Sequence, residues 1–132
     1  TSSVTSTNSI SSSPFSTTIN PTGSAPPSPS LKWTCDGIPY ATITQISFTN
    51  TTTGDTIAVP SLVLDASGDY LIIDTDAMSV RRSYDGGAEV DIDFTGIFPR
   101  FKAISNSYTV TITGGGGTWA LDQEITYFPA YL

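Results

Sequence analysis

Acidic residues are the most numerous groups in this sequence that could do chemistry. Glu89, Asp91 and Asp93 alternate with Val90 and Ile92, and alternate residues of a strand share one face. Carboxylate oxygens are the ligands that Ca²⁺ prefers, so this face is a candidate cation site. The same spacing is typical of the solvent-facing side of an outer strand. That simpler interpretation is favoured, and we expect no bound metal.

Two further pairs of acids flank short turns. Asp65 and Asp69 enclose a Ser–Gly turn, and Asp74 and Asp76 flank Thr75 at the end of a predicted strand. Asp is common in turns because its carboxylate accepts hydrogen bonds from nearby backbone N–H groups. A glycosidase needs two carboxylates facing a scissile bond, but 12 acids make some such pair inevitable. We therefore expect no enzyme activity, no catalytic residue and no cofactor.

Aromatic and arginine side chains are the candidates for binding. Aromatic rings stack on sugars in carbohydrate-binding β-sandwiches, and they also pack in cores and subunit contacts. Trp119 follows a run of glycines, which makes it the best candidate for an exposed ring. The Arg81–Arg82 pair could meet acids of a partner, or place one side chain in solvent and the other over an apolar edge. The candidate ligand or partner contacts are Trp119, Tyr84, Tyr127, Arg81 and Arg82, and further aromatic candidates are Trp33, Tyr40 and Tyr131.

Composition argues against several classes of protein. The chain has 132 residues with no His and one Cys, so it can build no Ser-His-Asp triad, Cys–His dyad or thiolate zinc cage. Cys35 lies beside Trp33 in an apolar alternation, which favours a buried thiol over a nucleophile. Five bases against 12 acids argue against nucleic acid as a partner. The apolar run 70–73 is far shorter than the roughly 20 residues that span a bilayer, so we expect no membrane insertion.

The elements that must position these residues are predicted to be strands. Apolar and polar residues alternate in segments such as 31–35, 70–74, 90–94 and 108–112, and turn residues separate them. No stretch of ten or more residues carries a helical stripe. We predict an all-β fold, an antiparallel two-sheet β-sandwich of jelly-roll or galectin-like type, with about eight to ten strands and no substantial helix.

The N-terminal segment has a composition of its own. Residues 1–30 contain no charge, and 17 of them are Ser or Thr. Such a stretch buries too little apolar surface to offset its ordering entropy. We predict that residues 1–13 form a Ser/Thr-rich arm or linker that orders on a neighbour, and that residues 14–132 form a single β-sandwich domain.

Four stretches, in order, carry a resemblance to a known family. They are 15–29, with its Asn–Pro–Thr–Gly turn, 46–56, with its Thr–Gly loop, 68–86, with its Gly–Asp–strand–Ile–Asp–Thr hairpin, and 94–129, with its Phe–Pro and closing Tyr–Phe–Pro segments. The combination resembles the C-terminal galectin-like or jelly-roll domain of phage distal tail proteins, found in long non-contractile tails. Residues 103–105 stand where the family has Pro–Gly. The family's ring-forming domain is not represented in these residues, so the resemblance does not imply ring building.

The resemblance implies a structural component of the virion. The chain would be a phage tail or tail-tip module that forms a homo-oligomer, as a ring or tail assembly, and contacts neighbouring tail proteins. Throughout 31–132, Thr alternates with Ile, Val and aromatic residues. This alternation gives the strands a second face that is neither charged nor strongly apolar, and such a face is suited to contact with a neighbouring subunit. The alternatives are a carbohydrate-binding module for host-surface glycan, with Trp119 as its stacking ring, and a self-assembling extracellular fibre subunit.

Overall fold

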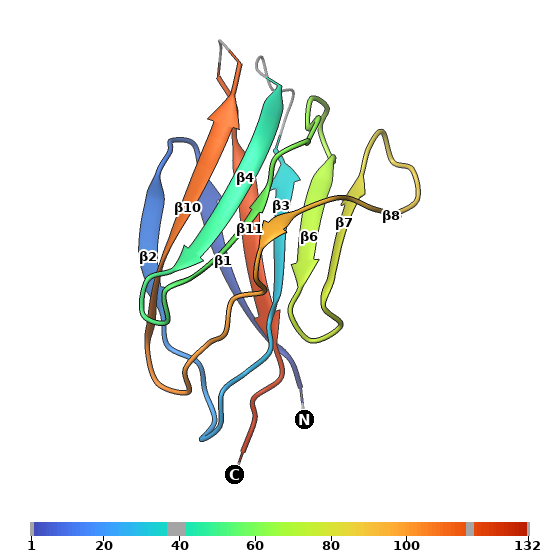
Figure 1. Cartoon of the computed structure of the whole chain (residues 1–132). Helices are drawn as coiled ribbons and strands as arrows, with labels where there is room; N and C mark the ends of the chain where they lie inside the picture. The colour runs from blue at the N-terminus through green and yellow to red at the C-terminus, as the bar shows by residue number, and fades with distance from the viewer. Residues whose placement is uncertain (1, 37–41, 116–117, 132) are drawn as a thin grey trace.

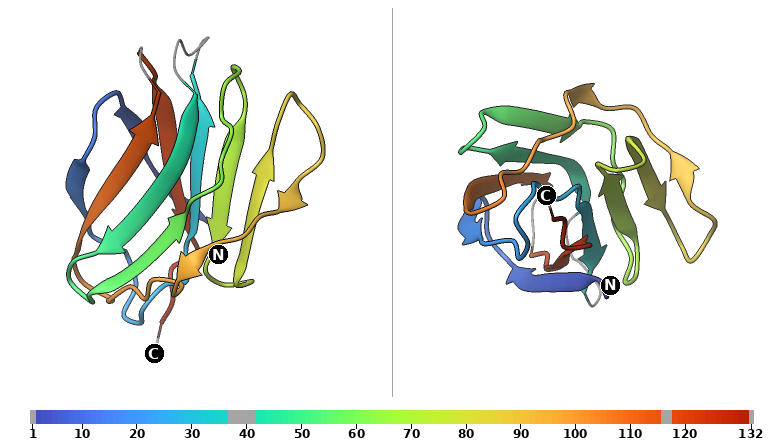
Figure 2. Two further views of the ribbon diagram at one scale, coloured as in Figure 1. Left: turned by 45° about the horizontal axis from the view of Figure 1, so that its top comes forward. Right: turned by 90° about the horizontal axis from the view of Figure 1, so that it is seen from below.

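The computed structural model describes residues 2–36, 42–115 and 118–131, and within them the fold is entirely β. Eleven strands form two antiparallel sheets that pack face to face (Figure 1). Seen from one end, the sheets form two curved layers around a common interior (Figure 2). The start of β1 and the end of β11 lie at the lower end of the sandwich in Figure 1. The predicted all-β sandwich is therefore confirmed.

The two sheets are named sheet A and sheet B. Sheet A has the strand order β1 (Val4–Ile10), β11 (Leu121–Tyr127), β3 (Ser30–Cys35), β6 (Tyr70–Asp74), β7 (Ser79–Ser83) and β8 (Val90–Asp91). Sheet B has the order β2 (Phe15–Ile19), β10 (Asn106–Gly114), β4 (Ile43–Asn50), β5 (Asp55–Val59) and β9 (Thr95–Gly96).

The strand pairing is nested, as in a jelly roll. β1 pairs with β11, β2 with β10, β3 with β6, and β4 with β5. Each pair lies inside the previous one along the chain, so one long antiparallel ribbon is rolled into two sheets. β7 and β8 extend sheet A and β9 extends sheet B. The predicted jelly-roll type is the observed connectivity.

The N-terminal segment is part of the sandwich rather than an arm. Residues 4–10 pair with β11 along their whole length, from Val4 opposite Tyr127 to Ile10 opposite Leu121. Ile10 is buried in the core, and Val4 packs against it. An edge strand is held by the backbone hydrogen bonds that its folded neighbour offers, so it needs little apolar surface of its own. The described part of 14–132 supplies ten strands, and β1 is the eleventh.

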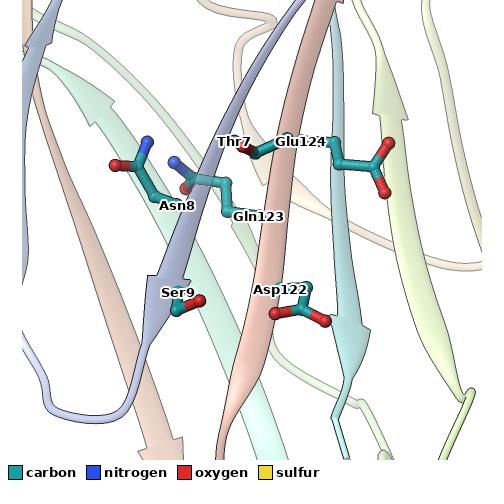
Figure 3. Close-up of a pocket in the computed structure, with 6 residues that line it drawn as sticks. All are labelled: Thr7, Asn8, Ser9, Asp122, Gln123 and Glu124. Atoms are coloured by element: carbon teal, nitrogen blue, oxygen red, sulfur yellow. The ribbon is translucent and has the colours of Figure 1, made fainter.

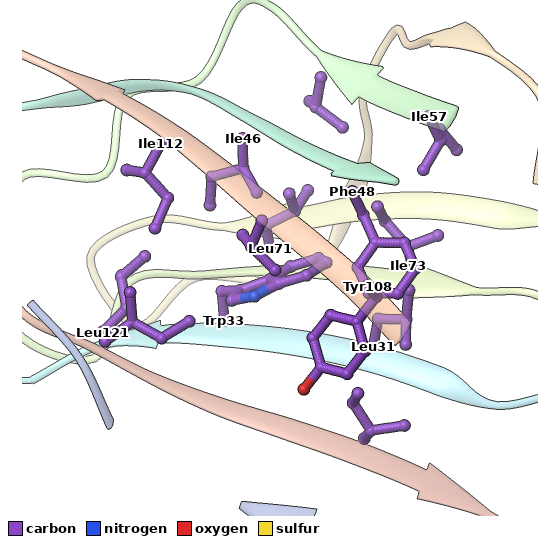
Figure 4. Packing of buried hydrophobic residues seen from close by; sticks show 14 of the residues in the cluster. Leu31, Trp33, Ile46, Phe48, Ile57, Leu71, Ile73, Tyr108, Ile112 and Leu121 are labelled. Atoms are coloured by element: carbon purple, nitrogen blue, oxygen red, sulfur yellow. The ribbon is translucent and has the colours of Figure 1, made fainter. Parts of the chain in front are cut away.

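The interior is filled by alternate residues of both sheets. β3 contributes Leu31 and Trp33, and β4 and β10 contribute Phe48 and Tyr108 from the opposite layer (Figure 4). The Phe48 ring centroid lies 5.1 Å from that of Tyr108 and 6.3 Å from that of Trp33. Aromatic pairs at such separations add to the burial of apolar surface.

A buried chain of hydrogen bonds crosses this interior. The indole Nε1 of Trp33 donates to Gln123 Oε1 at 2.8 Å, and Gln123 Nε2 donates to the Tyr108 hydroxyl at 2.8 Å. Trp33 and Gln123 belong to sheet A, whereas Tyr108 belongs to sheet B. Burial raises the pKa of Tyr108, which keeps its hydroxyl neutral. The chain therefore joins the two sheets at one relative position.

The predicted strand at 90–94 differs from expectation. Only Val90–Asp91 forms a strand, and Val90 and Phe94 are exposed rather than buried. β8 is the last strand of sheet A, and its far side has no neighbour among the described strands. Apolar and polar residues alternate along 90–94 and so lie on two opposite faces. The apolar face would be buried only if another layer of the protein packed against it, and at this edge Val90 and Phe94 stay exposed.

Replacing Gln123 tests the joint between the sheets. Gln123→Leu removes the partner of two buried polar groups, the Trp33 N–H and the Tyr108 hydroxyl, so we expect the free energy of unfolding to fall by about 2–4 kcal/mol. Urea denaturation measures the change. The control, Glu124→Gln, alters the next, outward-facing position and should stay within about 0.5 kcal/mol. A loss below about 1 kcal/mol for Gln123→Leu would contradict the role of this chain of bonds.

Candidate functional site

The aromatic candidates occupy unequal positions. Trp33 is buried in the core, and Tyr127 is 4% exposed, with its hydroxyl accepting a hydrogen bond from Thr22 N at 3.0 Å. Trp119 is partly buried and packs against the core, close to Gly114. Tyr40 lies outside the described residues, as does part of the glycine run before Trp119. Of these candidates, Tyr131 is largely exposed.

The candidate arginines bind groups of their own chain. The guanidinium carbon of Arg82 lies 4.1 Å from the Tyr84 ring centroid, and the Tyr84 hydroxyl accepts a hydrogen bond from Val63 N. Arg81 is half exposed and forms ion pairs with Asp91 at 3.3 Å and Glu89 at 3.9 Å. A partner at Arg81 or Tyr84 would therefore compete with contacts already made, and their role in partner binding stays a prediction.

The outward face of sheet A carries further paired charges. The Tyr70 hydroxyl donates to Glu89, and the Lys32 ammonium lies 4.3 Å from the Tyr70 ring centroid. The hydrogen bond to Glu89, followed by burial, raises the pKa of Tyr70. Glu89 bonds Tyr70 and Arg81, and Asp91 bonds Arg81, so two of the three acids of the candidate cation face at 89–93 belong to a surface ion-pair network.

A different set of acids does converge. Among the described residues, Asp65, Asp69 and Asp85 form the one group of three potential ligand residues whose donor atoms lie within 4.8 Å of one another. Asp69 is completely buried, and its two oxygens accept hydrogen bonds from the backbone N–H groups of Asp65, Ala66 and Asp85 at 2.8–3.2 Å. Asp69 thus ties two turns together, which is the turn chemistry expected for an Asp at this position. Asp65 contributes its backbone N–H to this contact.

The single thiol lies close to this cluster. Cys35 is 2% exposed. Burial, followed by the charges of Asp69 and Asp65, raises its pKa to about 11. A thiol with such a pKa remains protonated at neutral pH and is a poor nucleophile. Cys35 therefore acts as a small apolar core residue.

One ion pair anchors the lower end of sheet B. Asp55 is 4% exposed and accepts hydrogen bonds from Arg100 N and Nε at 2.9 Å and from Arg100 Nη2 at 3.1 Å. The Arg100 side-chain and backbone donors lower the pKa of Asp55 to about 2. This contact holds the segment around Arg100 against the start of β5.

A hollow that the sequence did not indicate lies where β11 and β6 end and β3 begins. Its volume is about 390 Å³. Ser28 and Ser30 line it between Phe128 on one side and the Asp74 and Asp76 carboxylates on the other. Phe128 is 66% exposed. The adjacency of Tyr127 and Phe128 could have indicated it, because consecutive residues of an extended chain point to opposite sides and only one of them can face the core.

A second hollow, of about 310 Å³, follows β1 and β11 (Figure 3). Its lining is entirely polar: Thr7, Asn8, Ser9, Asp122, Gln123 and Glu124. Asn8 and Gln123 turn to one side of β11 and Glu124 turns to the other (Figure 3). Gln123 is already bonded to Trp33 and Tyr108. The other lining residues offer hydrogen-bonding groups, but none of the six has an aromatic ring on which a ligand could stack.

The outward face of sheet B is the most uniform surface of the molecule. We call it the hydroxyl face. It consists of outward-pointing positions on all five strands of the sheet, ten of which are Ser or Thr: Ser16, Thr18, Gln45, Ser47, Thr49, Thr56, Ala58, Thr95, Ser107, Thr109, Thr111 and Thr113. It carries no charge, because Asp55 is the one charged residue of these described strands and it is buried.

The outward face of sheet A is different. It carries six charged residues: Lys32, Asp74, Arg81, Asp91, Asp122 and Glu124. The alternation of Thr with apolar residues predicted a face that is neither charged nor oily. Only sheet B realises that prediction across its whole width, and the tertiary fold sorts the charges onto the other sheet, the turns and the connections.

The protein is a jelly-roll β-sandwich. The hydrogen bonds of Asp69 and the ion pair between Asp55 and Arg100 hold its turns and connections in place. No helix among the described residues is long and apolar enough to cross a membrane. No protein-family model matches the sequence, and no curated protein sequence matches it.

The structure is similar to a solved phage protein. One of the matching structures is that of SPP1 Dit (gp 19.1), described as a paradigm of the hub adsorption apparatus in phages that infect Gram-positive bacteria. The TM-score is 0.52 at 12% sequence identity, over 95% of this chain. The chain spans 47% of the length of that protein. At this identity the comparison establishes a shared fold.

Removal of the Asp55 charge tests its pKa. Because the pKa of Asp55 is about 2 in the folded chain and ordinarily 3.8, the stabilising effect of its charge is complete above about pH 5 and is lost as the pH falls through 2. We expect Asp55→Asn to melt a few degrees below the native chain at pH 7, and this difference to shrink steadily as the pH falls from about 5 to 2. The control is Asp93→Asn, at an exposed acid without a bonded partner among the described residues, and it should change little. A melting difference that is independent of pH would refute the ion pair.

Proposed function

We propose that this chain is a structural module of a phage tail, which assembles with copies of itself and with neighbouring tail proteins in the virion. The observation that carries the proposal is the match of 95% of the chain to the hub protein SPP1 Dit. The resemblance of about residues 15–132 to the C-terminal galectin-like domain of distal tail proteins rests on sequence motifs alone and supports the same role.

The side-chain chemistry is consistent with a role that requires no catalysis and no cofactor. The Asp69 carboxylate bonds backbone groups, Asp55 bonds Arg100, and Cys35 is a protonated core thiol. A module of this kind acts by presenting surfaces. The two outward faces of the sandwich, one charged and one uncharged, are suited to different neighbours in a particle.

The location in the virion can be tested directly. Antibodies raised against the recombinant chain should label the tails of purified particles of the phage that encodes it. Tail-less heads from the same preparation serve as the control and should remain unlabelled. Absence of the chain from purified particles by quantitative mass spectrometry would refute the proposal.

A second candidate function is favoured by the hollow at Phe128. An exposed ring beside carboxylates and hydroxyls is the combination that binds sugars, because the ring stacks on C–H groups while the oxygens accept hydrogen bonds from sugar hydroxyls. Asp74 Oδ1 is occupied by the N–H groups of Asp76 and Ala77. Its other oxygen and the Asp76 carboxylate have no hydrogen-bond partner among the described residues. For this second candidate function, the hollow at Phe128 is a better site than Trp119, because Phe128 is exposed and Trp119 packs against the core.

A broad glycan array with the native chain and Phe128→Ala tests this candidate. If a glycan binds, the loss of the stacking ring should weaken its affinity at least about tenfold. Ile104→Ala, at an apolar residue with 81% exposure in the loop before β10, is the control and should bind as the native chain does. Absence of any glycan ligand, or equal binding by Phe128→Ala, would exclude this site.

A further inference from the structure

We infer that the hydroxyl face of sheet B is the surface through which one copy of this chain binds a second copy, face to face. The inference rests on the proposed assembly function and names its surface and its partner.

The first argument is the distribution of charge. The chain has a net charge of −7, so two copies repel each other, and the repulsion is weakest where the surfaces that meet carry no acids. The outward face of sheet A carries four carboxylates, from Asp74, Asp91, Asp122 and Glu124, against two cations, Lys32 and Arg81. Face-to-face contact through sheet A would therefore bring together two faces that each have an excess of negative charge. The hydroxyl face has none. Depletion of charge is also the compositional mark of the centre of protein interfaces.

The second argument is the low cost of removing this face from water. Several of its hydroxyls already bond one another across the strands: Ser16 with Thr109 at 2.8 Å, Thr49 with Thr56 at 2.9 Å, and Thr18 with Ser107 at 3.4 Å. Burying a polar group that keeps a hydrogen bond costs much less than burying an unpaired one. The Thr methyl groups of the same residues add apolar area that a partner can cover.

The third argument concerns the identity of the partner. A two-fold contact uses the same patch on both copies, so the patch must complement itself. Each hydroxyl is both a donor and an acceptor, and an array of hydroxyls therefore matches a second array of the same kind. A patch of one charge would instead indicate a partner of the opposite charge.

The size of the face sets the expected strength. The five strands, spaced about 4.8 Å apart with a mean length of about 20 Å, cover roughly 500 Å². Stable interfaces bury about 800 Å² on each partner. We therefore expect weak, concentration-dependent pairing of the isolated chain, which linkage of many copies in a particle would strengthen without any new contact.

A charge placed on the hydroxyl face tests the inference. Thr111→Glu introduces an acid at an exposed position of β10 whose hydroxyl makes no hydrogen bond to a described residue. Thr34→Glu places the same change on the outward face of sheet A, in β3. Sedimentation equilibrium up to about millimolar concentration should show dimers of the native chain. The dissociation constant should rise at least about tenfold for Thr111→Glu and stay within about twofold for Thr34→Glu.

The outcomes separate this inference from the proposed function. A native chain that is monomeric at millimolar concentration overturns self-pairing, as does a dimer weakened only by Thr34→Glu or a mass that grows without limit as in an open filament. None of these results bears on the presence of the chain in virion tails, which antibody labelling and mass spectrometry of purified particles test separately. Circular dichroism checks that the variants fold, and Ser47→Glu, at the neighbouring position of β4, replaces Thr111→Glu if that variant unfolds.

Discussion

Gln123 is the residue on which the arrangement of the two sheets depends most directly. It accepts from Trp33 within sheet A and donates to Tyr108 in sheet B, and all three side chains are nearly inaccessible to water. Apolar packing alone tolerates small sliding movements, because it has little direction. A buried pair of hydrogen bonds does not, because displacement would leave polar groups unpaired. This contact therefore helps to hold the two sheets, and the surface groups that they carry, at one relative position.

Once the sheets are set, the nested pairing determines which residues share a surface. Strands that are far apart in the chain become neighbours, such as β2 with β10 and β4 with β10. Their outward Ser and Thr residues then form one continuous uncharged face, while the acids and bases of β3, β6, β7, β8 and β11 form the other. The same rolled ribbon brings Phe128 beside Asp74 and Asp76. The outward faces of sheet A and sheet B therefore differ in chemistry, although both arise from the same alternation of buried and exposed residues along the strands.

The local pattern predicted much of the fold. The Tyr70–Asp74 strand and the buried alternation of Tyr108, Val110 and Ile112 were readable because a period of two is a local property. The pairing of residues 4–10 was not readable, since their stability comes from β11, more than a hundred residues away. The exposure of Val90 and Phe94 was missed for the related reason that an edge strand looks like any other strand in sequence.

The sequence by itself determined the class of fold, the absence of histidine chemistry and the presence of strand faces rich in hydroxyls, because composition and alternation are carried by each segment alone. Only the tertiary structure decided which hydroxyls join into one face, which acids converge at Asp69, and that Phe128 rather than Trp119 stands exposed beside carboxylates. These are relations between segments distant along the chain. They depend on the order in which the ribbon rolls up and on which edges remain uncovered, and no local pattern contains that information.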